Sequence, residues 1–169
     1  MEPNIHFGVE SAIGKGLKAW WSTLKDDRAT RAMLRRCATL DDIVLSPAYQ
    51  RFYRYMLACG WPDDAGNGQK DKLAAIAALA SWVEIDTDTN LPYQMSELDG
   101  DRLLVSELRF RALLKLDSTE DVFVSLRRAL PMIGRKTSII QLANDVFQWG
   151  DSTKKRWAYN YRWPQKQSA

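Results

Sequence analysis

The spacing of the apolar residues is the feature that most constrains what this chain can fold into. Near the N-terminus they recur every three or four positions, as on one face of an α-helix, at Val9, Ile13, Leu17, Trp20 and Leu24. Similar spacing recurs in several later segments, and no segment alternates polar and apolar residues for long enough to indicate a sheet. The sequence therefore predicts an all-α fold of about seven or eight helices, arranged as two small helical bundles.

Serine residues mark the expected starts of several helices. Ser46 precedes Pro47, which suits the first position of a helix. Ser118 and Ser138 each precede apolar residues at helical spacing, with an acidic or amide side chain three positions further on. The sequence predicts N-caps at all three serines.

The charge divides the chain into two unlike halves. Residues 1–101 hold 11 Lys and Arg against 15 Asp and Glu, whereas residues 102–169 hold 13 against 6. An acidic, irregular stretch lies where the two halves meet. We therefore predict an N-terminal helical bundle at residues 1–85, an acidic connector at 86–100 and a basic C-terminal helical bundle at 101–169. A basic half is typical of a protein that binds a polyanion, and a solvated basic surface is the alternative.

The residue types needed for catalysis or metal binding are scarce. The chain has one histidine, His6, and its two cysteines, Cys37 and Cys59, form no CxxC motif. No glycine-rich phosphate loop or nucleophile elbow is present, and the acidic pairs fall at turns or helix starts, where carboxylates cap backbone N–H groups. We expect a protein that is not an enzyme and that has no cofactor.

One acidic segment partly matches a calcium-binding loop. Asp86, Asp88, Asn90 and Glu97 occupy positions 1, 3, 5 and 12 of an EF-hand pattern. Position 6 of that pattern needs glycine for a sharp turn and is Leu91 here. The spacing therefore favours a solvated connector over a metal site.

The chain carries no sign of a membrane or secreted location. No apolar run reaches the length of about eighteen residues that a membrane span requires, and no basic N-terminal region leads into a hydrophobic stretch. Two cysteines without a disulfide suit a reducing compartment. We predict a cytoplasmic protein with no membrane partner.

The spacing of the basic residues is more informative than their number. Arg28, Arg31 and Arg35 fall at i, i+3 and i+7, along one helical face with Arg36 beside it. Like charges at this spacing repel one another, so an anionic partner would relieve the repulsion. Further cations occur on later predicted helices and in the loop at residues 134–136. Such groups would bind phosphates without regard to base sequence, unless they form salt bridges with the acidic half.

Cations and aromatic residues alternate near the C-terminus, as in proteins that bind single strands. Lys154 and Lys155 precede Trp157, and further aromatic residues follow at helical spacing. The rings at i and i+4 also suit the packing of a last helix onto the bundle, which we favour. Lys154, Lys155 and Arg156 remain candidates for phosphate contacts.

The order of these motifs resembles the CasB family, the small subunit of the type I-E CRISPR surveillance complex, Cascade. The segments that carry the resemblance lie between about residues 17 and 162 and are Trp20-Trp21, residues 31–36, Pro47-Ala48-Tyr49, residues 107–114, Leu126-Arg127-Arg128 and residues 142–149, followed by Trp157 and Tyr161. No single motif is specific, but their order and spacing together are.

The resemblance implies an all-helical subunit without enzymatic activity, present as two copies beside the other Cascade subunits. Such subunits hold the guide RNA and target DNA and steady the displaced DNA strand in antiviral defence, while base pairing with the guide reads the sequence. Carried over by position, the candidate nucleic-acid contacts are first Arg36, Arg109, Lys115 and Arg128, and then Arg35, Arg127, Lys154 and Lys155.

Two other classes of protein compete with this interpretation. A helical adaptor could use its basic half to bind an acidic protein and never meet nucleic acid. A helix-turn-helix regulator is disfavoured, because the connection from Pro131 to Thr137 exceeds the three- or four-residue turn of that motif.

Overall fold

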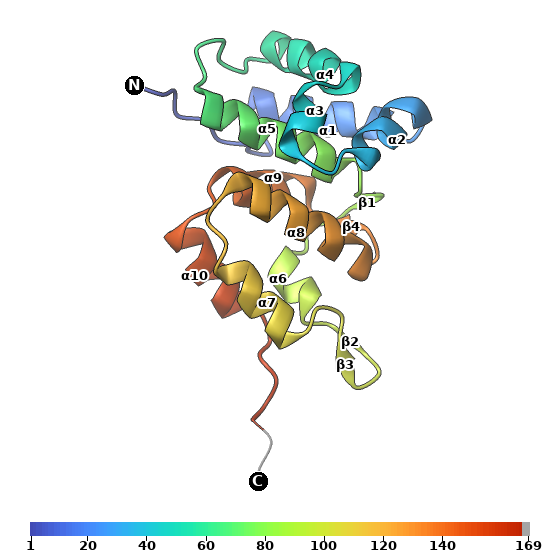
Figure 1. Ribbon diagram of the computed structural model, residues 1–169, viewed down its shortest axis with the longest axis vertical. Helices are drawn as coiled ribbons and strands as arrows, with labels where there is room; N and C mark the ends of the chain where they lie inside the picture. Colours follow the sequence, from blue (N-terminus) through green and yellow to red (C-terminus); the bar gives the residue numbers. More distant parts are fainter. Residues whose placement is uncertain (167–169) are drawn as a thin grey trace.

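The computed structural model describes residues 1–166 and shows two stacked layers of helices (Figure 1). The last three residues of the predicted basic bundle, 101–169, lie outside the described part. The upper layer contains α1 (Ala12–Thr23), α2 (Arg28–Arg36), α3 (Leu40–Val44), α4 (Pro47–Ala58) and α5 (Asn67–Ala80). The lower layer contains α6 (Leu91–Met95), α7 (Glu107–Leu114), α8 (Thr119–Met132), α9 (Ile139–Phe147) and α10 (Asp151–Asn160).

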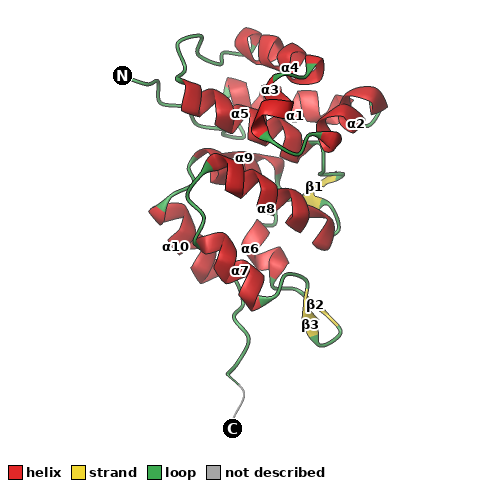
Figure 2. Ribbon diagram, viewed as in Figure 1, coloured by secondary structure: helices red, strands yellow, loops and turns green. Residues whose placement is uncertain are grey.

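The all-α prediction is confirmed, and the described residues form ten helices where about seven or eight were expected. Two of the ten, α3 and α6, have only five residues each, which is too short for a periodic pattern to be visible. The strands β1 (Ile85–Asp86), β2 (Leu98–Asp99), β3 (Arg102–Leu103) and β4 (Lys136–Thr137) have two residues each (Figure 2). Strands this short show no alternation of polar and apolar residues, so no local pattern predicts them.

The three predicted serine N-caps are confirmed. The side-chain oxygens of Ser46, Ser118 and Ser138 each accept a hydrogen bond from the backbone N–H three residues further on. Each of these bonds satisfies one of the free N–H groups in the first turn of a helix. The starts of α4, α8 and α9 are therefore fixed by local chemistry.

Helix α5 lies at the centre of the molecule. Its residues from Leu73 to Ala80 are all buried, and the helix packs against α3 in its own layer and against α8 and α9 below. Alanine side chains allow neighbouring helices to approach closely on every side. Buried residues from both layers form one continuous hydrophobic core.

The segment predicted as an acidic connector is tied to the lower layer. Strand β1 pairs with β4 in parallel, with Ile85 opposite Lys136 and Asp86 opposite Thr137. The Asp86 carboxylate accepts a hydrogen bond from the backbone N–H of Ile139 at 2.9 Å. The short helix α6 follows immediately, so positions 6 to 10 of the partial EF-hand pattern are helical. Among residues 1–166 there is no group of three or more His, Cys, Asp or Glu placed to hold a metal ion.

Aromatic residues hold the lower layer together. Phe110 on α7 stacks on Tyr161 with 3.9 Å between ring centroids, and Trp157 on α10 stacks on the same Phe110 ring at 6.3 Å. The Trp157 indole donates to the buried Asp145 carboxylate at 2.9 Å. Helices α7, α9 and α10 are thereby joined. None of the helices within the described residues is long and apolar enough to span a membrane.

Candidate nucleic-acid interface

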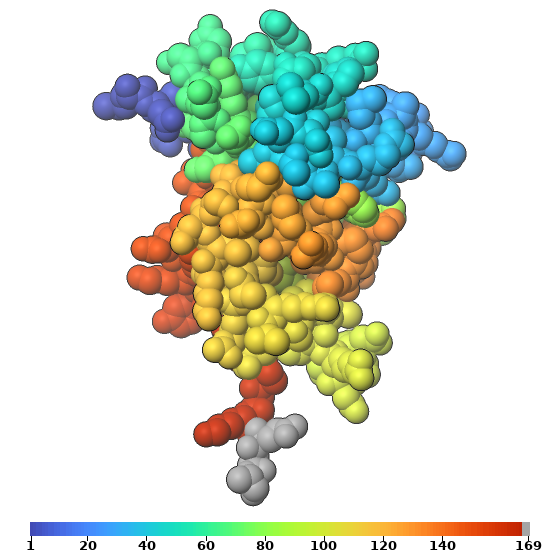
Figure 3. All heavy atoms as spheres, viewed as in Figure 1, coloured from blue at the N-terminus to red at the C-terminus, as the bar shows by residue number. Residues whose placement is uncertain are grey.

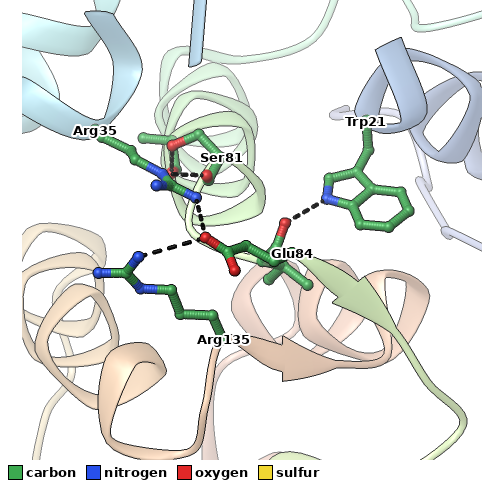
Figure 4. Close-up of polar contacts among 7 residues, drawn as sticks. Trp21, Arg35, Ser81, Glu84 and Arg135 are labelled. Atoms are coloured by element: carbon green, nitrogen blue, oxygen red, sulfur yellow. Dashed lines mark hydrogen bonds and ion pairs between the residues drawn. The ribbon is translucent and has the colours of Figure 1, made fainter. Parts of the chain in front are cut away.

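Two of the predicted contact residues, Arg35 and Arg127, lie in the seam between the two layers. The Arg35 Nε donates to the Ser81 carbonyl oxygen at 2.6 Å, at the end of α5 (Figure 4). An Arg127 Nη donates in turn to the carbonyl oxygen of Arg35 at 2.9 Å. Arg127 thus links α8 in the lower layer to the last turn of α2 in the upper layer.

A half-buried tryptophan, Trp82, is the centre of this region. The guanidinium carbons of Arg35, Arg127 and Arg135 lie 5.3, 5.5 and 5.4 Å from the centroid of its ring. These distances suit cation–π attraction. The carboxylate of Glu84 pairs with both Arg35 and Arg135, at 3.5 and 3.4 Å. We call Arg35, Trp82, Glu84, Arg127 and Arg135 the seam cluster.

The charges of the seam cluster are crowded. Burial lowers the pKa of the Arg35 guanidinium, and the neighbouring Arg135 and Arg31 lower it further by repulsion. Glu84 acts in the opposite direction and raises that pKa. The cluster holds three positive charges against one carboxylate.

Two cations of the C-terminal motif also have partners inside the chain. Lys154 pairs with Asp117 at 2.7 Å, and its side chain is only 16% exposed. Arg156, a further candidate from the same motif, pairs with the buried Asp145 at 2.5 Å. Both charges are therefore paired within the chain, which the sequence did not indicate.

The remaining five predicted contact residues form what we call the outer cations. They are exposed, and none forms an ion pair with a residue in the described part of the chain: Arg36, Arg109, Lys115, Arg128 and Lys155. The helices that carry most of them, α2, α7 and α8, form much of the face seen in Figure 3, where α7 and α8 are yellow to orange. No acidic side chain among residues 1–166 forms an ion pair with any of these five charges.

A groove between α7 and α8 brings two of the outer cations together. Arg109 and Arg128 both line this cavity of 310 Å³, beside Ala112, Ser125 and Met132. An Nη of Arg109 lies 3.4 Å from the Met132 sulfur, a weak acceptor that leaves most of the guanidinium N–H groups free. The groove thus presents two forked donors on neighbouring helices, an arrangement suited to phosphate oxygens.

The aromatic residues near the C-terminus divide into two kinds. Trp157 and Tyr161 are buried, so the packing interpretation is confirmed for this pair. Tyr159 is 91% exposed, whereas Trp163 lies edge-on to Phe110 with 5.5 Å between ring centroids. Only Tyr159 projects fully into solvent as a base-stacking ring would.

Arg135 is the residue whose importance sequence reasoning missed. It was noted only as part of a basic loop, yet it contacts both Trp82 and Glu84. Its φ of 57° lies in the left-handed region, which a non-glycine residue seldom adopts. The preceding Gly134, at φ 80°, was the available signal for an unusual turn.

Fold and site together define a small, two-layered helical protein with unpaired exposed cations on its helices. The chain belongs to the Cse2 family, because the sequence model of the family described as CRISPR-associated protein Cse2 matches residues 30–161. This is the family whose other name is CasB, so the resemblance drawn from the motifs is confirmed.

A solved structure shares the fold. It is a chain in the crystal structure of E. coli Cascade bound to a PAM-containing double-stranded DNA target, with a TM-score of 0.64 and 18% identity. The similarity covers 91% of this chain and 95% of that one. No curated protein sequence matches this chain at the threshold applied.

Proposed function

We propose that this chain is the non-catalytic small subunit of a type I-E Cascade complex, in which it binds the nucleic-acid backbone without regard to base sequence. The observation that carries the proposal is the match to the Cse2 family over residues 30–161. All five outer cations lie within that matched segment. The structural neighbour comes from a Cascade complex bound to its DNA target, which supports the same assignment.

The chemistry of the outer cations suits backbone contacts. In an RNA-guided complex, base pairing between guide and target reads the sequence, and the protein needs only to hold the strands. Arginine donates two parallel hydrogen bonds to a phosphate, and Lys115 and Lys155 supply point charges. The subunit would then stabilise guide RNA and target DNA pairing, and the displaced strand, beside the other Cascade subunits and a second copy of itself.

The titratable residues support a role without catalysis. His6 is exposed in the segment before α1 and lines a hollow together with Asp145 and Arg156. Asp27 accepts hydrogen bonds from the backbone and side chain of Thr30, which lower its pKa and make it a helix cap. The buried Asp145 is bound by Trp157 and Arg156. These carboxylates are engaged in structural contacts.

Co-expression with the other Cascade subunits and a guide RNA, followed by purification through a tag on this chain, tests the proposal. We expect the other subunits and the guide RNA to co-purify, and the assembly to retain target DNA with an affinity that falls steeply with salt. Recovery of this chain alone, free of RNA and partners, would contradict the proposal. A second measurement uses a complex that lacks this subunit and is purified through a tag on another subunit. If the tagged chain co-purifies with the complex, but the complex without it retains DNA equally well, the adaptor that binds only an acidic protein is favoured.

A further inference from the structure

The seam cluster is poorly neutralised by the residues around it. Both guanidinium contacts of Glu84 fall on the same oxygen, Oε1, at 3.4 Å from Arg135 and 3.5 Å from Arg35. Hydrogen bonds between charged groups are normally about 2.7–2.9 Å long. Glu84 therefore balances the charge of the cluster only loosely, and its side chain is 49% exposed.

Two hydrogen-bond donors of the cluster have no acceptor. The Arg127 Nε and the Trp82 Nε1 are buried and form no hydrogen bond with any residue in the described part of the chain. An unpaired buried donor destabilises a protein, and such exceptions in a native fold call for an explanation. Both of these buried groups are donors and therefore need an acceptor, and the three positive charges of the cluster favour an anionic one.

The backbone holds the cluster in place. The Glu84 N–H donates to the Arg135 carbonyl oxygen at 2.7 Å, beside the pairing of β1 with β4. Arg135 keeps its left-handed φ of 57° in this arrangement, although an arginine there is strained. Strained backbone of this kind persists where the surrounding structure enforces it, and it is often found at binding sites.

The cluster opens to solvent on one side. Glu84 is the member of the cluster that lines a hollow of 710 Å³, together with Lys25, Arg31 and Asp86, and the Asp86 carboxylate is already paired with Lys18 at 3.0 Å. Arg31 is the residue whose charge, with that of Arg135, depresses the pKa of Arg35. An anion that enters this hollow would meet further positive charge before it reached Glu84.

We propose that the seam cluster is a binding site for a backbone phosphate of nucleic acid, and that Glu84 occupies it as an internal substitute until the phosphate displaces its carboxylate. A phosphodiester offers two charged oxygens and can accept hydrogen bonds from several guanidinium groups at once. Binding would exchange two long contacts for shorter ones. The proposal rests on the proposed function, because the phosphate comes from the nucleic acid held by the assembled complex.

Removing the charge of Glu84 tests this site. In the assembled complex, Glu84→Gln should tighten the retention of target DNA by about tenfold, the effect of one charge-assisted hydrogen bond. The slope of log affinity against log salt should change little, because the phosphate contacts the site in the bound complexes of both proteins. The matched control is Glu10→Gln, which removes the same charge from an exposed pair with Lys15 at 3.3 Å. Equal retention by the two variants would overturn the proposal.

A second variant shows whether the tighter retention of target DNA arises from the seam cluster. Arg135→Asn removes a guanidinium and suits the left-handed backbone. Combined with Glu84→Gln, it should abolish most of the tighter retention, because the phosphate loses one of its donors. A full gain in the double variant would contradict the proposed site. Each variant is compared in complexes of equal subunit and RNA content, so that a failure of assembly, which would count against the proposed function, is seen separately.

Inorganic phosphate distinguishes the source of the anion. For the full chain alone, phosphate should raise the melting temperature more than chloride at equal ionic strength, and more so in the Glu84→Gln variant than in the Glu10→Gln variant. Stabilisation by free phosphate with DNA retention unchanged would show that the site takes a small anion and would overturn the assignment to nucleic acid.

Discussion

Arginines that are adjacent in the sequence of this protein lie in different environments. Arg35 and Arg127 face the seam between the layers, whereas Arg36 and Arg128, the next residues along α2 and α8, are exposed. Successive residues of an α-helix project about 100° apart, so one arginine of each pair can face a neighbouring layer while the other faces solvent. A pair of arginines in sequence therefore does not define one site.

The difference between the seam cluster and the outer cations lies in what each charge contacts. Arg127 donates to the Arg35 carbonyl and lies over Trp82, so its side chain helps to hold α2 and α8 together. Arg128 contacts solvent and the groove between α7 and α8. The seam cations thus contribute to the stability of the fold. The outer cations contribute positive charge to the surface of the protein.

The largest difference in the free energy of unfolding is predicted between substitutions of Arg127 and Arg128. Arg127→Ala should lower the free energy of unfolding by about 1–3 kcal/mol, because it leaves a carbonyl oxygen without its donor and removes packing against an indole. Arg128→Ala should change it by less than about 0.5 kcal/mol, as surface substitutions usually do. Urea unfolding followed by circular dichroism measures both. Equal effects of the two substitutions would break the distinction.

A smaller effect is expected at the aromatic stack that anchors α7, the helix of Arg109. The Tyr161 hydroxyl donates to the Val105 carbonyl oxygen at 2.8 Å, so Tyr161→Phe should cost about 1 kcal/mol at neutral pH. Retention of full stability by this variant would show that the hydrogen bond contributes nothing. Chemical unfolding at pH 7 makes the comparison.

The same substitution has a pH signature with a defined sign. Burial, and secondarily Glu107, raises the pKa of Tyr161 from 10.0 to about 12. Folding therefore favours the protonated phenol, and this stabilisation is complete below pH 10 and is lost as the pH rises through about 12. Unfolding measured between those values should show a steeper loss of stability in the unsubstituted protein than in Tyr161→Phe. Parallel curves would contradict burial of the phenol.

The smallest effect on the free energy of unfolding is expected where a cation is paired only with an exposed carboxylate. Asp117 is 90% exposed, so its pair with Lys154 resembles the weak ion pairs of protein surfaces. Asp117→Asn should change the free energy of unfolding by less than about 0.5 kcal/mol, and the difference should vanish at high salt. A loss as large as that of Arg127→Ala would place Lys154 with the seam cations.

Local patterns in the sequence were sufficient to predict the longer helices and the starts of three of them. Periodic apolar residues marked the longer helices, and Ser46, Ser118 and Ser138 marked three N-termini. The five-residue helix α6 was not predicted, because it has little more than one turn. The pairing of β1 with β4 joins segments about fifty residues apart, and no local pattern encodes such a contact.

The candidate site was predicted as a set of residues but not as a geometry. The chemistry that marks a phosphate contact also marks an internal ion pair, and the choice depends on partners far away in sequence. Lys154 has Asp117 as its partner, 37 residues earlier, and Arg35 has Glu84, 49 residues later. Only the folded chain shows which cations are left without a partner.

The salt dependence of target-DNA retention by the assembled complex tests the central claim most directly. We compare the unsubstituted subunit with a triple variant of the outer cations, Arg109→Ala, Lys115→Ala and Arg128→Ala. The control carries three exposed basic residues of the upper layer changed to alanine, Lys15, Arg51 and Arg54. If all three outer cations contact phosphates, the slope of log affinity against log salt should become shallower by about 2.7, with weaker retention at every salt concentration. The same slope as in the control would contradict the claim that these residues bind the nucleic-acid backbone.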